Sequence, residues 1–328
     1  MTLSTTRNDL DQADYDDVLR RLSEASVDKH FDPYVDIAWD SPEFAVTPND
    51  PRWILNPQDD PLGSHPWYQA LPDEKKIEIG MWRQANVAKV GLQFENILIR
   101  GMTQYVFSLP NGSAEYRYCT HECIEEGNHT LMFQEMVNRI GVDAPGMGPV
   151  LRGLSPFIPL AAGPLPELFF VGVLAGEEPI DHIQKTFLRG SGNMHPIMKS
   201  VMAIHVAEEA RHISFAHQYL KRRVPEMSRV GRFALSIAMP ITMRILCDAI
   251  VVPPKSFWKR FDIPKSVRKE LFWGSPETRA MLRNYFGDVR MLAQDAGLMN
   301  RFSKRVWKAC KIDGDVSRFR SEPVRRAA

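Results

Sequence analysis

The sequence contains few cysteines, and their spacing excludes two common structural devices. The four cysteines do not form a C-x-x-C pair, and they do not follow the pattern of a small disulfide-stabilised domain. They are Cys119, Cys123, Cys247 and Cys310. We therefore expect reduced thiols in a cytoplasmic protein, with Cys119 and Cys123 serving as small buried apolar residues.

The sequence also lacks a strong net charge and a long uninterrupted apolar run. Its 41 Lys and Arg residues nearly balance its 40 Asp and Glu residues, so no global field would attract nucleic acid. The apolar stretch 156–175 is broken by prolines, and the stretch 233–252 contains Arg244 and Asp248. A spanning helix needs roughly 20 apolar residues, so we predict no membrane span. The polar, acidic N-terminus predicts no signal peptide.

Helical patterns dominate what remains. Residues 1–70 are rich in Asp and Pro and show a helical period only around residues 15–25, which predicts an extended arm packed on a larger body. Apolar residues would anchor this arm. They are Trp39, Trp53, Ile54 and Trp67.

A single helical domain is predicted over residues 71–312, with a four-helix core over residues 73–222. Its core helices are expected over residues 73–107, 113–140, 166–188 and 196–222, with Ser113 able to cap the second. Further helices are expected over residues 229–252, 264–273, 276–297 and 300–311. The basic tail, residues 313–328, is predicted to be mobile.

Two of the predicted core helices each contain a Glu-x-x-His motif. Glu126 and His129 are three residues apart on the second helix, and His205, Glu209 and His212 follow one another at helical spacing on the fourth. Residues three or four apart share one face of a helix, so each set can reach a single point. One such motif is weak evidence for a metal site, but two on neighbouring core helices are more specific.

The other two core helices carry glutamates within apolar surroundings. Glu95 lies between Phe94 and Leu98 on the first helix, and Glu177 and Glu178 follow an apolar run on the third. Burying an unpaired carboxylate is costly, and a dication removes that cost. Residue spacing alone leaves the choice between Glu177 and Glu178 open.

This arrangement is typical of carboxylate-bridged di-iron or di-manganese bundles. A mixed shell of carboxylates and imidazoles suits iron or manganese better than a structural zinc ion, which favours thiolates. The fold class predicted is therefore all-α, a ferritin-like four-helix di-iron bundle with an N-terminal arm and additional C-terminal helices.

The motifs resemble those of the para-aminobenzoate N-oxygenase family, because His205 lies four residues before Glu209 and adds a third histidine to the usual set. The resemblance covers the bundle, and its spacing favours Glu178 over Glu177. The ligands it implies are Glu95, Glu126, His129, Glu178, His205, Glu209 and His212.

By the same resemblance, the protein would be a homodimeric di-iron monooxygenase. It would use two iron ions, dioxygen as co-substrate and electrons from an external donor or redox partner to oxidise an aryl amine to a hydroxylamine or nitro product. No protein acid or base is assigned apart from the metal centre. A di-iron hydroxylase or desaturase with a non-amine substrate, and a non-catalytic ferritin-like metal-binding protein, are the alternatives.

The sequence says less about the residues that contact the predicted ligands or the substrate. Asp181 or Glu125 could orient a metal-bound histidine, as such imidazoles usually require, although both could equally be surface residues. Arg100 and Arg244 could bind a substrate carboxylate, but structural arginines are the favoured interpretation.

Overall fold

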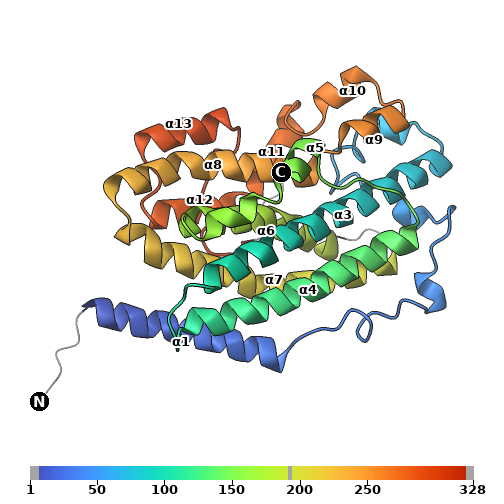
Figure 1. The fold of residues 1–328 in the computed structure, drawn as a ribbon. Coiled ribbons are helices and arrows are strands. Elements are labelled where there is room, and N and C mark those ends of the chain that lie inside the picture. The colour runs from blue at the N-terminus through green and yellow to red at the C-terminus, as the bar shows by residue number, and fades with distance from the viewer. Residues whose placement is uncertain (1–6, 191–193, 323–328) are drawn as a thin grey trace, which may run out of the picture.

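The computed structural model describes residues 7–190 and 194–322, and every regular element within them is helical (Figure 1). The core consists of α3 (Asp73–Val106), α4 (Ala114–Ile140), α6 (Pro166–Arg189) and α7 (Pro196–Arg223). Helix α3 packs along α4, α6 packs along α7, and α4 contacts α7 across the bundle. The all-α, ferritin-like bundle predicted from the sequence is confirmed.

Local sequence explains where these helices begin and end. Helix α3 begins with Asp73 and Glu74, whose charges oppose the positive end of the helix dipole. Helix α4 ends at Gly141, whose φ of 71° is a conformation that glycine adopts at little cost. Ser113 occupies the position before α4, but its side chain makes no capping hydrogen bond, contrary to the prediction.

Helix α6 contains a proline in its interior. Pro179 has no backbone N–H, so the carbonyl of Ala175 loses its usual helical partner. The two neighbouring glutamates, Glu177 and Glu178, are therefore placed in a segment whose regular hydrogen bonding is interrupted.

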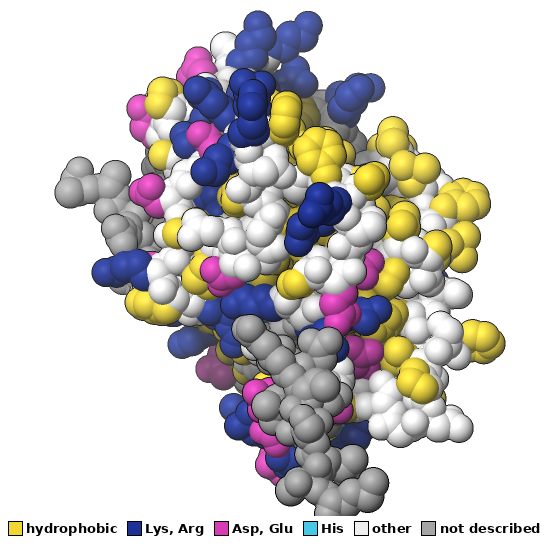
Figure 2. Space-filling model, turned by 90° about the vertical axis from the view of Figure 1, so that its left-hand side faces the viewer, with side chains coloured by type: hydrophobic (Ala, Val, Ile, Leu, Met, Phe, Trp, Pro, Cys, Tyr) yellow, Lys and Arg dark blue, Asp and Glu magenta, His cyan; other side chains and the backbone are white. Residues whose placement is uncertain are grey.

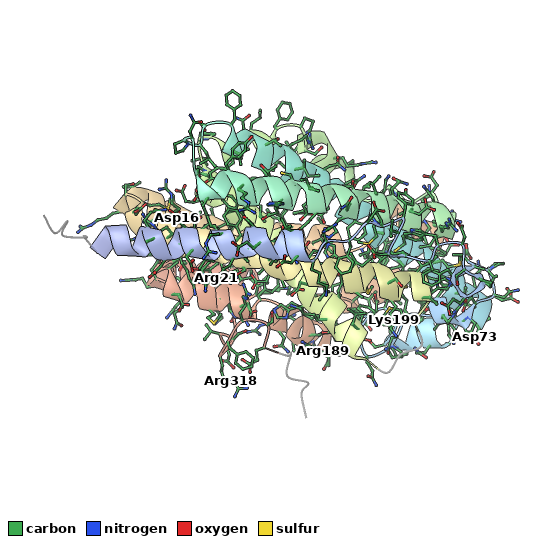
Figure 3. The ribbon with its side chains drawn as sticks, turned by 90° about the horizontal axis from the view of Figure 1, so that it is seen from below. Asp16, Arg21, Asp73, Arg189, Lys199 and Arg318 are labelled. Carbon is green, nitrogen blue, oxygen red and sulfur yellow. The ribbon has the colours of Figure 1, made fainter. Side chains whose placement is uncertain are left out.

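The N-terminal region packs on the bundle, but it is more helical than predicted. Helix α1 (Arg7–Asp28) lies along α4 and α7, as seen from below in Figure 3, with Asp16 and Arg21 on its outer side. The hydroxyl of Tyr15 donates to Glu115 of α4 at 2.8 Å. The amphipathic pattern visible over residues 15–25 thus belongs to a longer helix, whose first turns are too polar to be recognised by periodicity.

Beyond α1, residues 29–72 form an irregular segment with only short helices. These are η1 (Pro42–Phe44), η2 (Pro51–Trp53) and α2 (Pro66–Gln69). The ring of Trp53 stacks on His195 at 4.5 Å, and Arg139 lies over Trp39. Buried Asp60 pairs with Arg83 of α3.

The C-terminal helices cover the opposite side of the bundle. Helix α8 (Arg229–Val251) packs mainly against α6, and α12 contacts both α6 and α7. The predicted helix over residues 276–297 is interrupted at Tyr285 and Phe286. The remaining short helices are α5 (Pro149–Leu154), η3 (Ile158–Ala162), η4 (Val224–Glu226), α9 (Lys255–Arg260), α10 (Lys265–Glu270), α11 (Pro276–Asn284), α12 (Gly287–Asp295) and α13 (Arg301–Ala309).

Residues 313–322 do not form a free tail, contrary to the prediction. The backbone N–H of Ser317 donates to the carbonyl of Gly287, and the N–H of Ser321 donates to Asp288. Arg290 donates to the carbonyl of Asp315 at 2.8 Å. The rest of the predicted tail, residues 323–328, lies outside the described residues.

One described segment, residues 229–260, is long and apolar enough to cross a membrane by length and composition. In the fold, 44% of its most apolar window is buried against other parts of the chain. The absence of a membrane span stays a prediction.

Gly80 provides a test of how the irregular segment is held. A Cβ atom at this position would lie 1.8 Å from the carbonyl oxygen of Trp53, and backbone cannot yield as a side-chain tip would. We expect Gly80→Ala to lower the free energy of unfolding by about 3 kcal/mol. Denaturant unfolding measures this, with Gly172→Ala in α6 as control. A Cβ at Gly172 meets nothing within 4 Å. Equal stability of both variants would contradict the packing described.

Candidate metal centre

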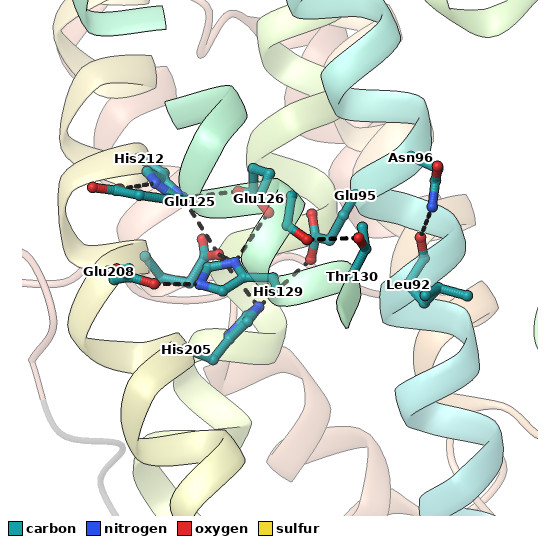
Figure 4. A network of polar contacts seen from close by, with 12 residues as sticks. Leu92, Glu95, Asn96, Glu125, Glu126, His129, Thr130, His205, Glu208 and His212 are labelled. Atoms are coloured by element: carbon teal, nitrogen blue, oxygen red, sulfur yellow. Dashed lines mark hydrogen bonds and ion pairs between the residues drawn. The ribbon is translucent and has the colours of Figure 1, made fainter. Parts of the chain in front are cut away.

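Three of the four core helices bring six of the seven predicted ligands together in the middle of the bundle, and Figure 4 labels those other than Glu209. Helix α3 contributes Glu95, α4 contributes Glu126 and His129, and α7 contributes His205, Glu209 and His212. All six residues are at most 4% exposed. The motif spacing therefore predicted correctly which residues share the interior.

The side chains form two groups of potential ligands that share one member. One group contains Glu95, His129, His205 and Glu209, and the other contains Glu126, Glu177, Glu209 and His212. Within each group, one ligand atom from every residue lies within 4.8 Å of all the others. Because Glu209 belongs to both groups, its carboxylate is placed to bridge two ions.

The distances between ligand atoms suit metal binding. Nε2 of His205 lies 3.5 Å from Oε1 of Glu95 and 3.3 Å from Oε1 of Glu209. Nδ1 of His212 lies 2.8 Å from Oε1 of Glu126 and 3.5 Å from Oε1 of Glu209. Two ligand atoms that bind the same ion at about 2.1 Å lie roughly 3 Å apart when the two metal–ligand bonds form a right angle.

The third core helix corrects the predicted ligand set. Glu177, not Glu178, faces the cluster, and it shares its side of α6 with Ile180 and Gln184. The carboxylate of Glu178 instead lies 3.2 Å from Nε2 of His217. Family spacing favoured Glu178, but the rotation of α6 about its axis decides which neighbour points inward, and spacing between motifs does not fix that rotation.

Each histidine predicted to bind metal has an outer partner for its second ring nitrogen. Nε2 of His129 lies 2.8 Å from Glu208, Nε2 of His212 lies 2.7 Å from Glu125, and Nδ1 of His205 lies 2.8 Å from Oε1 of Gln184. An N–H donated to each acceptor leaves the other nitrogen free to bind metal. The partners thus direct Nδ1 of His129 and His212, and Nε2 of His205, toward the cluster.

Only part of this outer layer was predicted. Glu125 does orient a histidine, and it also accepts from Arg211 at 2.8 Å. Asp181 does not have this role, because its carboxylate pairs with Lys185 at 2.6 Å. Glu208 and Gln184 were missed, since their contacts join different helices and leave no mark in the local spacing.

The metal-free cluster holds more negative charge than the interior favours. Burial, followed by the charges of Glu126 and Glu209, raises the pKa of Glu95 well above its usual value. Burial and the charge of Glu209 raise the pKa of Glu177 in the same direction. These carboxylates can ionise together only if positive charge enters the site.

The pKa values of His205 and His129 are shifted in opposite directions. Burial lowers the pKa of His205 to about 4, so this ring is neutral at physiological pH. Burial also acts to lower the pKa of His129, but the carboxylate of Glu126 outweighs it and raises the value to about 10. The charge of Glu126 thus favours the protonated form of His129, whereas the buried surroundings of His205 favour its neutral form.

Another buried carboxylate lies one turn before Glu126. Glu122 is fully buried, and neither of its oxygens has a hydrogen-bond partner. Burial raises its pKa to about 8, although the nearby charge of His212 acts to lower it. It was not singled out from the sequence, where it could be read as part of a charged surface.

A separate buried group joins α6 to the C-terminal helices. Glu178, His182 and Asp288 lie close together, and Nε2 of His182 is 3.5 Å from Oδ2 of Asp288. Asp288 also accepts from the backbone of Ser321. These contacts link the bundle to the chain's final described segment.

The donor set fits two divalent cations because many buried ligand atoms have no hydrogen-bond partner. A buried polar atom without a partner costs free energy, and metal coordination would satisfy these atoms. They are Oε2 of Glu95, both oxygens of Glu177 and Glu209, and Nε2 of His205.

Sequence comparison also points to a family of proteins with a dimetal site. Residues 12–297 match the family described as P-aminobenzoate N-oxygenase AurF, which covers most of the chain. The chain belongs to the p-aminobenzoate N-oxygenase family. The resemblance noted from the motifs is confirmed, and the buried glutamate and histidine groups match the dimetal site typical of this ferritin-like family.

Mycobacterial relatives of this N-oxygenase family member are similar to it along most of their length. An uncharacterized protein of Mycobacterium tuberculosis is 65% identical over 316 residues, which cover 96% of this chain and 93% of the relative. An uncharacterized protein of Mycobacterium bovis matches with the same identity and coverage.

The two arginines considered for substrate binding lie away from the cluster. Nε of Arg100 donates to the carbonyl of Asn96. Arg244 pairs with Asp248 at 3.0 Å, donates to the carbonyl of Cys310 and lies 4.1 Å from the ring centroid of Trp273. Both arginines therefore make contacts within the fold and do not face the cluster.

Neighbouring glutamates on α6 allow a matched test of the ligand set. We expect Glu177→Gln to weaken binding at one metal position, because an amide supplies no charge, and to reduce the ferrous iron bound at equilibrium. Glu178→Gln should still bind two ions per chain. Iron content after dialysis at a fixed free-iron concentration measures both. The reverse pattern would restore Glu178 as the ligand.

The outer acceptors can be tested separately from the ligands. We expect Glu125→Gln to keep two metal positions but to lower their affinity by about 10–100-fold, because the amide polarises His212 less than a carboxylate does. Competition with a chromophoric chelator measures the affinity. Glu135→Gln on the outer part of α4, where Glu135 pairs with Arg139, is the control. An unchanged affinity in Glu125→Gln would show that this contact does not support metal binding.

Proposed function

We propose that this protein is a di-iron monooxygenase that uses dioxygen to oxidise an aryl amine to a hydroxylamine or nitro product. The single observation that supports it best is the inward position of His205, beside Glu95 and Glu209. A third histidine in a carboxylate-rich dimetal site is the feature that distinguished this family from other ferritin-like proteins. Family membership supports the reaction class, and the amine specificity follows from the family's name.

The residues would divide between two iron ions. Glu95, His129 and His205 would hold one ion, Glu177 and His212 would hold the other, and Glu209 would bridge them. Glu126 lies near both His129 and His212 and completes the set. Iron bound in this way supplies the redox chemistry that dioxygen activation requires. Manganese would fit the same oxygen and nitrogen donors.

The protein's own side chains would control protonation at the centre. Glu125 and Glu208 carry negative charge outside the ligand histidines, so each ring can give up the proton facing the metal and keep the proton facing the acceptor. Arg211 lies 2.8 Å from Glu125 and 3.6 Å from Glu208 and balances their charge. The tautomer of His129 and His212 would thereby stay fixed during turnover.

The interior position of the site would protect the reaction from water. The ligands are buried between four helices, and the cavity beside them is lined mainly by apolar side chains. Electrons would come from an external donor or redox protein. A homodimeric, cytoplasmic enzyme remains the expectation that follows from the sequence.

The proposal is tested by loading the protein anaerobically with ferrous iron, counting the metal, and adding isotope-labelled dioxygen with a reductant and an aryl amine. We expect two ions per chain, oxygen consumption that requires iron, and label on the amine nitrogen by mass spectrometry. Zinc-loaded protein is the control, since zinc has no redox chemistry. Two bound irons without oxygen consumption would refute the oxygenase, and label on carbon alone would refute N-oxygenation.

A further inference from the structure

The cavity next to the metal ligands is too small for an aromatic substrate. It is lined by Glu95, Glu177 and His205, but its volume is about 50 Å³. That is room for a water molecule or two, whereas binding pockets for organic ligands usually have volumes of about 300–1,000 Å³. A substrate that reaches the centre therefore needs additional space.

A second, larger cavity lies on the other side of Phe94. Its volume is about 310 Å³, and it lies between α3, α6, α8 and the segment containing α5 and η3. We call it the apolar chamber. It is lined by Phe94, Ile97, Leu98, Met147, Leu151, Ile158, Ala161, Leu168, Phe169, Gly172, Val173, Thr242, Ile245 and Leu246.

Phe94 separates the apolar chamber from the metal ligands. Its side chain lines both cavities and packs against Gly176, where an added Cβ atom would lie 1.9 Å from the phenyl ring. Gly176 directly precedes Glu177, and Phe94 directly precedes Glu95. Rotation of this one side chain would join the two cavities at the metal centre.

The lining of the apolar chamber selects against a charged ligand. Among the described residues that line it, none is Lys or Arg, and Thr242 is the one polar side chain. A carboxylate placed there would lose its hydration without gaining a partner, which is strongly unfavourable. The free carboxylate of para-aminobenzoate would find no cationic side chain in the apolar chamber.

The outer end of the apolar chamber meets an apolar surface. Ile245 lines the chamber and is 49% exposed, and Leu154, Phe157 and Leu160 of the neighbouring α5–η3 segment are at least half exposed. Figure 2 shows hydrophobic side chains gathered along one side of the molecule. An apolar ligand would thus meet an apolar surface before it enters.

We propose that the apolar chamber binds the uncharged, apolar part of the substrate while the reactive group passes Phe94 to the metal centre. This inference rests on the proposed function for the identity of the reactive group, but the binding site itself does not. The substrate class is an uncharged aryl amine with an apolar substituent, rather than an aminobenzoate anion.

Gly172 allows the chamber to be filled without disturbing its walls. It lines the chamber, and a Cβ atom at this position would meet nothing within 4 Å. Gly172→Leu should therefore place its side chain in the open space. Gly153→Leu is the matched control, because Gly153 on α5 is exposed, has equally open surroundings and lines neither cavity.

The experiment measures binding to zinc-loaded protein, in which the metal positions are filled and no oxidation occurs. The probe is N-phenyl-1-naphthylamine, an uncharged dye that fluoresces in apolar surroundings. Aniline, 4-butylaniline and 4-hexylaniline then compete with the dye. We expect affinity to rise up to about fourfold for each methylene added. Gly172→Leu should weaken dye binding at least tenfold and remove the dependence on chain length, and Gly153→Leu should resemble the wild type. Gly172→Ala, which adds a single methyl group, should give an intermediate loss and serves if the leucine variant does not fold.

Several outcomes would overturn the inference. Competition by 4-aminobenzoate as strong as that by 4-butylaniline would show that charge is accepted, and equal binding by Gly172→Leu and the wild type would place the dye on the outer surface. Failure of the proposed function is distinguishable, because alkylanilines would then bind with the expected dependence on chain length but remain unoxidised by the iron-loaded enzyme. If the iron-loaded enzyme oxidises aniline and the alkylanilines but their affinity does not depend on chain length, the proposed function stands and the binding role of the apolar chamber is refuted.

Discussion

The organisation of this protein depends on the repulsion between carboxylates that are buried together without enough positive charge. Glu95, Glu126, Glu177 and Glu209 come from all four core helices and meet in an interior where water cannot screen them. Helices that bury such groups need cations between them. Metal binding and helix packing are therefore linked, because ions that satisfy the carboxylates would also join α3, α4, α6 and α7.

The histidines extend this requirement outward. A ring bound to metal through one nitrogen presents the N–H of its other nitrogen to the protein. Glu125, Glu208 and Gln184 accept hydrogen bonds from these N–H groups at 2.7–2.8 Å. Two of these acceptors are themselves buried acids, and Arg211 partly neutralises them. Charge thus alternates from the centre of the bundle toward its edge. This alternation explains why a helix with so many polar residues as α7 can lie in the core.

Sequence periodicity predicted the bundle and most of the site because these features depend on contacts within single helices. Glu126 with His129, and His205 with Glu209 and His212, share a face by helical geometry alone. The choice between Glu177 and Glu178 depends on how α6 is rotated in the assembled bundle, and Pro179 interrupts the helix at that point. Glu208 and Gln184 depend on contacts between helices. Helix α1 was underestimated because its first turns have no apolar period, and residues 313–322 were misjudged because backbone hydrogen bonds to α12 hold them.

The position of α1 has a consequence for the order in which the molecule assembles. This helix is synthesised before its partners, α4 and α7, and α7 ends at Arg223. Two-thirds of the chain must be synthesised before α1 can find its complete surface, so its hydrophobic side, including Tyr15 and Leu19, stays without its native cover during that time. Contacts so distant in sequence form late because the intervening loop must first be closed. Helix α1 therefore depends on later parts of the chain for its cover, and it in turn covers two helices that carry five of the seven predicted metal ligands.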